Sequence, residues 1–256
     1  MLRRRHSILL IFLLALPLLA AAPLLQDPGL YDYIGDLDGK TAIGLTLHQR
    51  DGQKVSGSYF YKKYLKDIPL AGEFTGDRDL VLRENDAKGQ SAGTFNLHFA
   101  ESDPRHMRSG DALTVDVLTG KWTSSDQSKS SPVYLALTTI AAGATDGKRY
   151  AAAGATDDAL VERSVQAFCA AVGAGDRKAV ASHLSYPVAF SIGGKRSRAR
   201  NEQEFLGDYD RIFTAKFVER LRAAVPHNMF ANAQGIMIAD GAVWFDDKGR
   251  AVALNN

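Results

Sequence analysis

Short segments in the first part of the chain alternate between apolar and polar residues. Ile43, Leu45 and Leu47 alternate with small or polar neighbours, which predicts a strand with one apolar face. The pair Asp51-Gly52 predicts a hairpin turn after this strand, because Asp-Gly tolerates the positive φ angles that such turns require. Comparable segments follow at residues 55–61, 68–74, 80–84, 93–99, 113–122 and 133–139.

Residues 30–140 are therefore expected to form a β-meander domain of about seven or eight antiparallel strands. Evenly spaced strands with short turns favour a closed barrel or a sandwich, and the pattern does not choose between the two. Residues 141–156 are rich in Ala, Gly, Thr and Asp and lack apolar periodicity. This stretch is interpreted as a linker.

The period of the apolar positions changes to that of a helix after residue 156. Thr156 or Asp157 is a suitable N-cap, Gly173 and Gly175 are suitable stops, and the apolar stripe between them consists of Val161, Val165, Phe168, Cys169 and Val172. Further helices are expected at 176–184, from a capping box at Asn201 and Glu204, and at 215–224. Strands are expected at 187–192, 196–200, 235–239, 242–245 and 251–254. Residues 157–256 thus read as an α+β domain.

Several pieces of this second domain support a family resemblance. They are Gly175-Asp176-Arg177-Lys178, Ser185-Tyr186-Pro187-Val188, Asn201-Glu202-Gln203-Glu204-Phe205, and Gly235-Ile236-Met237-Ile238 before Gly241-Ala242-Val243-Trp244-Phe245. With the order of helices and strands, they resemble the NTF2-like cone, as found in uncharacterised envelope proteins of Gram-negative bacteria. The resemblance implies helices packed on a curved sheet around a pocket, in a fold that hosts both enzymes and binding modules.

The first 22 residues have the composition of a secretory signal peptide. Arg3, Arg4 and Arg5 precede an apolar run of about a dozen residues, and Ala20-Ala21-Ala22 supplies a cleavage site. The run is shorter than the roughly 20 residues that span a bilayer. The mature chain is therefore expected to be periplasmic or extracellular and not to span the membrane.

The charge of the chain argues against a nucleic-acid-binding protein, and its cysteine content argues against a disulfide-stabilised one. The leader carries three of the 31 basic side chains, so the net charge of +2 disappears on cleavage. Without a basic excess, the chain lacks the electrostatic footprint of a nucleic-acid-binding protein. Cys169 is the single cysteine, which precludes an intramolecular disulfide, and its place on an apolar helix stripe predicts a buried structural thiol rather than a nucleophile.

No catalytic motif is present in the sequence in the context that its chemistry requires. The patterns His-Glu-x-x-His and Ser-x-x-Lys do not occur, and the one match to Gly-x-Ser-x-Gly, at residues 89–93, leads into the expected strand 93–99 instead of the helix that a nucleophile elbow requires. His98, Glu101, Asp103 and His106 are metal-ligating types within nine residues, but their spacing matches no metal motif and is more typical of a surface loop. Asp36 and Asp38 are read as turn residues. We expect neither a metal nor a cofactor.

Two groups of residues remain as candidate binding sites. The first group is Lys195, Arg196, Arg198 and Arg200. The three arginines lie on the expected strand 196–200, where alternate residues share a face, so their guanidinium groups would form a stripe suited to carboxylate or phosphate. The alternative is a solvated edge strand whose charges discourage strand pairing. In the second domain, His183, Tyr186, Asp208, Tyr209 and Trp244 would line the pocket of a cone.

These observations favour a non-enzymatic exported protein that binds another envelope component, either a protein or an anionic polymer. An inhibitor or immunity-type partner of a periplasm-targeted enzyme is one concrete version of this hypothesis. The alternative is a small-molecule-binding or enzymatic NTF2-like cone that uses the polar residues around Tyr186 and Trp244. A purely structural envelope protein is the third interpretation.

Overall fold

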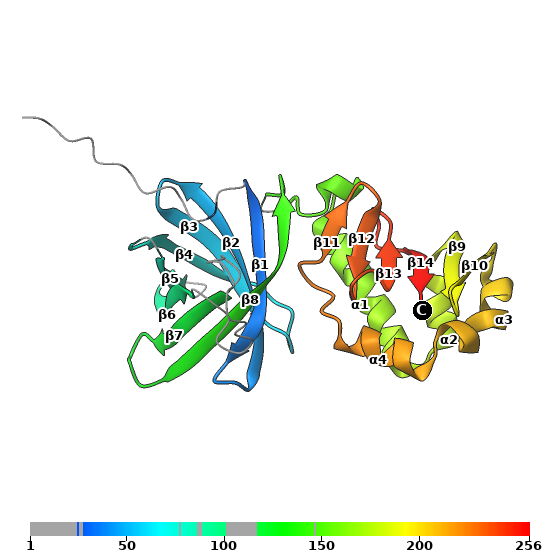
Figure 1. Cartoon of the computed structure of the whole chain (residues 1–256), viewed down its shortest axis with the longest axis horizontal. Coiled ribbons are helices and arrows are strands. Elements are labelled where there is room, and N and C mark those ends of the chain that lie inside the picture. Colours follow the sequence, from blue (N-terminus) through cyan, green and yellow to red (C-terminus); the bar gives the residue numbers. More distant parts are fainter. Residues whose placement is uncertain (1–24, 26–27, 77, 86–88, 101–116, 146) are drawn as a thin grey trace, which may run out of the picture.

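The protein has an α+β fold in which an antiparallel barrel is followed by a region of helices packed on a sheet (Figure 1). The computed structural model describes residues 25, 28–76, 78–85, 89–100, 117–145 and 147–256. The expected signal peptide at residues 1–22 lies outside the described residues. Within the described part of the chain, no helix is long and apolar enough to cross a membrane.

The N-terminal region closes into an eight-stranded barrel, which decides between the two architectures that the sequence left open. Each strand pairs antiparallel with the next, and the last pairs back with the first. The strands are β1 (Gly29–Leu37), β2 (Thr41–Asp51), β3 (Lys54–Tyr61), β4 (Ile68–Phe74), β5 (Asp79–Asn85), β6 (Ser91–Phe99), β7 (Val117–Ser124) and β8 (Ser130–Ala142).

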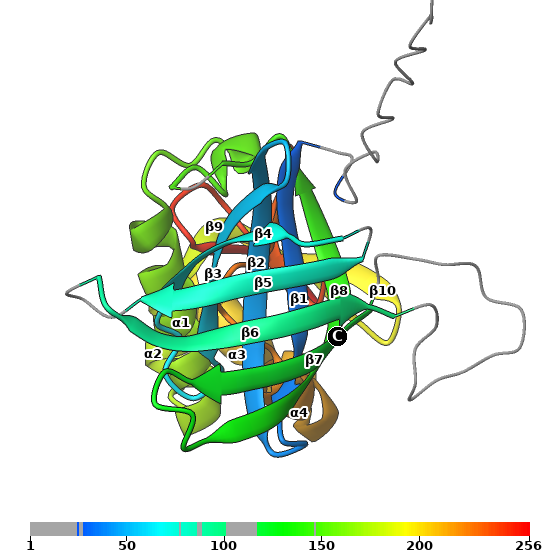
Figure 2. The same ribbon diagram turned by 90° about the vertical axis from the view of Figure 1, so that its left-hand side faces the viewer.

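Side chains fill the interior of the barrel. The predicted inward positions of β2 are confirmed, since Ile43, Leu45 and Leu47 are each at most 1% exposed. Tyr59 and Phe95 meet edge to face in the same core, with their ring centroids 5.1 Å apart. Figure 2 looks onto the wall formed by β4–β7, with β1 and β2 behind it. An eight-stranded barrel is just wide enough for its side chains to pack, so this interior is a hydrophobic core.

The C-terminal region is a six-stranded sheet with helices on one face. Its strand order is β10-β9-β14-β13-β12-β11, and only the β14–β9 pair is parallel. The strands are β9 (Leu184–Ile192), β10 (Lys195–Ala199), β11 (Phe230–Asn232), β12 (Gly235–Ile238), β13 (Val243–Phe245) and β14 (Ala251–Asn255). The helical elements are η1 (Ala151–Ala153), α1 (Asp158–Ala174), α2 (Arg177–Ser182), α3 (Glu202–Ile212) and α4 (Ala215–Ala223).

Local side-chain caps determine where these helices begin. The carboxylates of Asp157 and Asp176 accept hydrogen bonds from the first turns of α1 and α2, at 2.9 and 3.0 Å. Asn201 caps α3 in the same way, through the backbone N–H of Glu204 at 2.9 Å. Gly175 ends α1 with φ of 69°. The sequence predicted the caps at Asp176 and Asn201, because short polar side chains satisfy the free N–H groups of a first turn. For α1 it left Thr156 or Asp157 open as the cap and Gly173 or Gly175 as the stop, and the structure selects Asp157 and Gly175.

The element boundaries differ from the sequence-based expectation at several places. β10 ends at Ala199, so Arg200 follows the strand instead of belonging to it. The three-residue strand β11 was not predicted, because Phe230–Asn232 is too short to show a period. β8 runs on to Ala142, and the expected linker 141–156 contains η1. Residues 113–116 of the expected strand 113–122 lie outside the described residues.

We expect the Gly93→Ala substitution to destabilise the barrel by about 1–3 kcal/mol, because overpacking forces neighbours out of place. A Cβ atom at Gly93 would lie 2.6 Å from Nε1 of Trp122. Urea unfolding measures the loss, and near-UV circular dichroism reports the displaced indole. Gly76→Ala is the matched control in the same barrel, since its Cβ would meet only the Asp79 carboxylate, at 3.4 Å. Equal stability of the two variants would contradict the packing argument.

Candidate functional site

A buried ion pair joins the barrel to the C-terminal region. Arg149, in the segment between β8 and α1, donates from Nη1 to Asp32 Oδ2 at 2.6 Å and from Nη2 to Asp32 Oδ1 at 3.0 Å. Both side chains are 7% exposed. Thr46, directly opposite Asp32 in the β1–β2 register, donates to Asp32 Oδ1 at 2.7 Å. Asp32 and Thr46 point out of the barrel, so the C-terminal region is what buries them.

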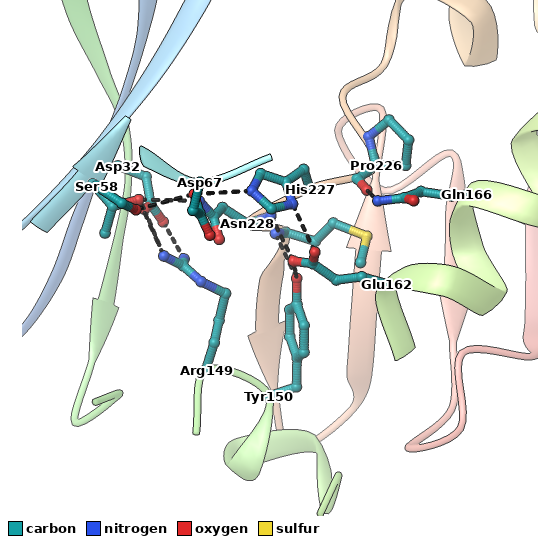
Figure 3. A network of polar contacts seen from close by, with 12 residues as sticks. Asp32, Ser58, Asp67, Arg149, Tyr150, Glu162, Gln166, Pro226, His227 and Asn228 are labelled. Carbon is teal, nitrogen blue, oxygen red and sulfur yellow. Dashed lines mark hydrogen bonds and ion pairs between the residues drawn. The ribbon is translucent and has the colours of Figure 1, made fainter. Parts of the chain in front are cut away.

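A second link lies beside this pair and is centred on His227, in the loop before β11 (Figure 3). Its Nδ1 lies 2.6 Å from Glu162 Oε2 on α1, and its Nε2 lies 3.1 Å from Asp67 Oδ1, in the loop before β4. The ring also meets Phe60 on the outer wall of the barrel, with centroids 4.4 Å apart. His227 is therefore held from the barrel and from helix α1 at once.

Asn228 connects the two links into one network. Its side-chain amide donates to Thr46 Oγ1 at 3.2 Å, and its backbone N–H donates to Glu162 Oε1 at 3.1 Å. Tyr150 donates its hydroxyl proton to the same Glu162 oxygen at 2.8 Å and accepts from the N–H of Met229 at 3.1 Å. We call this network the polar bridge; its members are Asp32, Thr46, Asp67, Arg149, Tyr150, Glu162, His227 and Asn228.

The charges of the polar bridge reinforce one another. Burial alone would lower the pKa of His227, but the hydrogen bonds to Asp67 and Glu162 and the charges of these carboxylates raise that pKa to about 9. Burial alone would raise the pKa values of Glu162 and Asp67, but the hydrogen bond and charge of His227 hold both below their usual values. At neutral pH an imidazolium ion thus lies between two carboxylates.

This arrangement fixes the two regions together and is poorly suited to catalysis. A general base needs a free nitrogen and a pKa near the working pH, whereas both ring nitrogens of His227 are engaged and its pKa lies near 9. The Asp32 carboxylate is likewise occupied by Arg149 and Thr46. The chemistry of the polar bridge is that of a structural contact between domains.

Two cavities flank the polar bridge, and Thr46 and Asn228 line both. The first, of about 420 Å³, lies between the outer wall of the barrel and β11–β12, and its apolar lining includes Phe60, Met237 and Phe230. The second, of about 520 Å³, is lined by members of the bridge and by serine and threonine residues. Domain interfaces are common places for ligand pockets.

The predicted basic group lies on the free edge of the C-terminal sheet. Lys195, Arg196 and Arg198 are exposed on β10, and Arg200 is exposed just after it. Arg196 and Arg198 share one face, while the shorter strand leaves Arg200 outside the expected stripe of three. Among the described residues, no ion pair or side-chain hydrogen bond engages any of these four basic groups.

The residues expected to line a cone pocket do not converge. Trp244 lies on the face of the sheet opposite to its buried neighbours Val243 and Phe245. Tyr209 stacks on Phe213 with ring centroids 4.6 Å apart, and the hydroxyl of Tyr186 donates to the carbonyl of Ala181 at 3.2 Å.

The other two members of that group have local roles. His183 is the C-cap residue of α2, and Asp208 pairs with Arg211 at 2.6 Å. Neither of the two cavities is lined by any of the five expected pocket residues.

The remaining candidates occupy ordinary structural positions. Cys169 packs half-buried against the core, and burial raises the pKa of its thiol to about 12. His98 bonds to Asp79 through Nδ1 at 2.8 Å, whereas Glu101, Asp103 and His106 lie outside the described residues. In the part of the chain that the structure describes, no group of three or more His, Cys, Asp or Glu side chains is placed to hold a metal ion.

Comparison with known proteins adds no assignment to this geometry. No family model, no curated protein and no solved structure matches the chain.

Sequence reasoning missed the polar bridge as a whole. Arg149 lies in a segment without periodicity, and Asp32 and Thr46 occupy outward positions that the pattern assigns to solvent. The one usable signal is Arg149-Tyr150, a large pair in a stretch of small residues shortly before the two acidic residues at the start of α1. Asp158 holds this pair in place, accepting the N–H of Arg149 at 2.7 Å and that of Tyr150 at 3.3 Å.

We expect Arg149→Ala to destabilise the protein by about 3–5 kcal/mol, because it leaves the buried Asp32 carboxylate without a counter-charge. Arg177→Ala is the matched control: Arg177 forms a similar pair with Asp210, at 2.6 Å, but that pair is exposed. Its loss should cost about 1 kcal/mol or less. Urea unfolding followed by circular dichroism measures both values. Equal costs for the two variants would show that the buried pair has no special role.

The stability of the protein should depend on pH through His227. The stabilising contribution of a group with a raised pKa is complete below its unfolded value, 6.5, and is lost as the pH rises through about 9. The contributions of Glu162 and Asp67, whose pKa values are lowered, are lost at the acidic end instead. Urea unfolding between pH 6 and 10 should therefore show an alkaline decline that is absent from His227→Gln. The same decline in both proteins would contradict this assignment.

Proposed function

We propose that this chain is an exported, non-enzymatic binding protein of the cell envelope that engages an acidic partner through the basic edge strand β10. The observation that carries the proposal is the set of four basic side chains, Lys195, Arg196, Arg198 and Arg200, exposed at one sheet edge without a partner among the described residues. Guanidinium groups bind carboxylates in pairs of parallel hydrogen bonds, so such an edge favours an acidic surface.

The contrast with other arginines supports this reading. Arg149, Arg177 and Arg211 pair with carboxylates of their own chain. Arg222 and Arg250 bond to backbone carbonyls. Charges that only need to keep a surface soluble are usually dispersed, whereas these four lie within six residues of sequence. An inhibitor or immunity-type complex with a periplasm-targeted enzyme is the concrete version that we favour. Both ring nitrogens of His227 are engaged, and Ser91 of the Gly-x-Ser-x-Gly match begins strand β6 instead of lying on a strand-to-helix turn.

We also propose that the C-terminal region is a shortened NTF2-like cone. The packing of four helices on one face of a six-stranded sheet supports this, as do the sequence pieces that carry the resemblance. The first interdomain cavity, of about 420 Å³, favours a second candidate function, the binding of a small molecule. That ligand would lie between the domains and not inside the cone.

Affinity purification tests the main proposal. The tagged chain from residue 23 onward is used to capture proteins from an envelope extract, beside Arg196→Ser/Arg198→Ser/Arg200→Ser. We expect one abundant partner, released by salt, whose recovery falls at least tenfold with the triple variant. Lys178→Ser/Lys216→Ser/Lys248→Ser is the matched control, because it removes the same charge from exposed positions elsewhere in the domain. Equal recovery with all three proteins would exclude the β10 edge as the binding site.

A further inference from the structure

A single row of residues crosses all six strands on the outer face of the C-terminal sheet. Pairing register places side by side Phe230 of β11, Met237 of β12, Trp244 of β13, Ala253 of β14, Ala189 of β9 and Arg198 of β10. All six are exposed or half-buried. The next row, Ile238, Val243, Leu254 and Phe190, is buried under the helices. From β13 to β10, the outer row is therefore a face of the sheet without a covering layer, while Phe230 and Met237 face the barrel across the first cavity.

The side chains of this row form a shallow trough. Ala189 and Ala253 make a floor two strands wide, with the Trp244 indole on one side and the Arg198 guanidinium on the other. Strands are about 4.8 Å apart, so these two walls stand about 14 Å apart. An α-helix with its side chains is about 10–12 Å across. A helix running along β9 and β14 fits between the walls, whereas a flat sheet of larger residues would leave it no recess.

Charge distinguishes the two sides of the trough. Arg196 and Arg198 lie on the same face of β10, two residues and therefore about 6.6 Å apart. Acidic residues at positions i and i+4 of a helix are spaced by about 6 Å. A helix with such a pair along one flank could place one carboxylate opposite each arginine.

The opposite side of the trough is bounded and apolar. Met237 and Phe230 continue the row into the first interdomain cavity, whose other wall is formed by Ile34 and Phe60 of the barrel. The barrel thus closes the trough on this side, and β10 leaves it open on the other. An occupant needs an apolar stripe toward Trp244 and an acidic flank toward β10.

We infer that this outer face is the docking surface for an amphipathic helix of a partner protein, with its apolar stripe over Ala189, Ala253 and Trp244 and its acidic flank against Arg196 and Arg198. This inference rests on the proposed function, because it uses the same two arginines, and it adds the class of the partner element. The sheet has helices on one face only, and the docked helix would cover the other face. Sheets in layered folds are commonly covered by helices on both faces.

The experiment begins with a display library of helix-biased 20-residue peptides selected on the full chain from residue 23 onward. Counter-selection uses Arg196→Glu/Arg198→Glu. We expect the enriched peptides to carry apolar residues at helical spacing and acidic residues at i and i+4. Enriched peptides with period-two patterns, with no acidic pair, or with no dependence on the two arginines would overturn the inference.

Intrinsic fluorescence then locates the bound peptide. The chain has two tryptophans, and Trp122 lies in the barrel, where its Nε1 donates to Glu84 at 3.2 Å. In a Trp122→Phe background, the emission of Trp244 should shift to shorter wavelength when the helix covers it. Ala189→Gln should weaken binding at least fivefold by raising the trough floor, while Lys178→Glu/Lys216→Glu, which introduces the same negative charge elsewhere, should leave binding unchanged.

A charge exchange makes the test specific. A peptide with lysines in place of its acidic pair should fail to bind the original chain and should recover binding to Arg196→Glu/Arg198→Glu. A blue shift of Trp244 that depends on protein concentration alone would identify a second copy of the chain as the occupant and overturn the inference. If an envelope partner requires the arginines but leaves Trp244 unchanged, the proposed function stands and the helix inference fails; if no partner requires them, both fail.

Discussion

The buried pair of Arg149 and Asp32 is the contact on which the arrangement of this protein depends. Two opposite charges can remain in such a position, at 7% exposure, only when each satisfies the other. Thr46 and Asn228 complete the hydrogen bonding around the pair and tie it to His227 and Glu162. Because every member must be in place for the others to be satisfied, the bridge specifies one orientation between barrel and sheet. The two domains are thus oriented by polar contacts in an interface that has a cavity on either side of the bridge.

Because the polar bridge lies between the two domains, their outer surfaces remain available for recognition. The barrel is closed around a core of apolar side chains, so it offers no free strand edge in its described part. The C-terminal sheet is open: β10 lies at one edge, and β11 lies at the other, beside the barrel. The basic residues and the half-exposed Trp244 therefore lie on the part of the molecule that is least covered by its own chain. Rigid attachment to the barrel keeps that face in one position.

The parts of the fold that the sequence predicted are those decided by local physics. The alternation in β2 and the caps at Asp157, Asp176 and Asn201 depend on neighbours within a few residues. Barrel closure depends on pairing β1 with β8, more than 90 residues away, which no local pattern reveals. The polar bridge is still harder to predict from the sequence, because Asp32 and Thr46 have the pattern of solvent-facing residues and are covered by another domain. The basic edge was found because a cluster of charge is visible without any knowledge of contacts.

The separation of the bridge partners along the chain has a consequence for the order of folding. Asp32 and Arg149 are 117 residues apart, and Asp67 and His227 are 160 apart. During synthesis from the N-terminus, all eight strands of the barrel are available before residue 149. His227 arrives almost eighty residues later still. The barrel can thus fold first. The second region then assembles against a surface on which Asp32, Thr46 and Phe60 are already in position. The barrel serves as the template for the orientation of the domain that follows it.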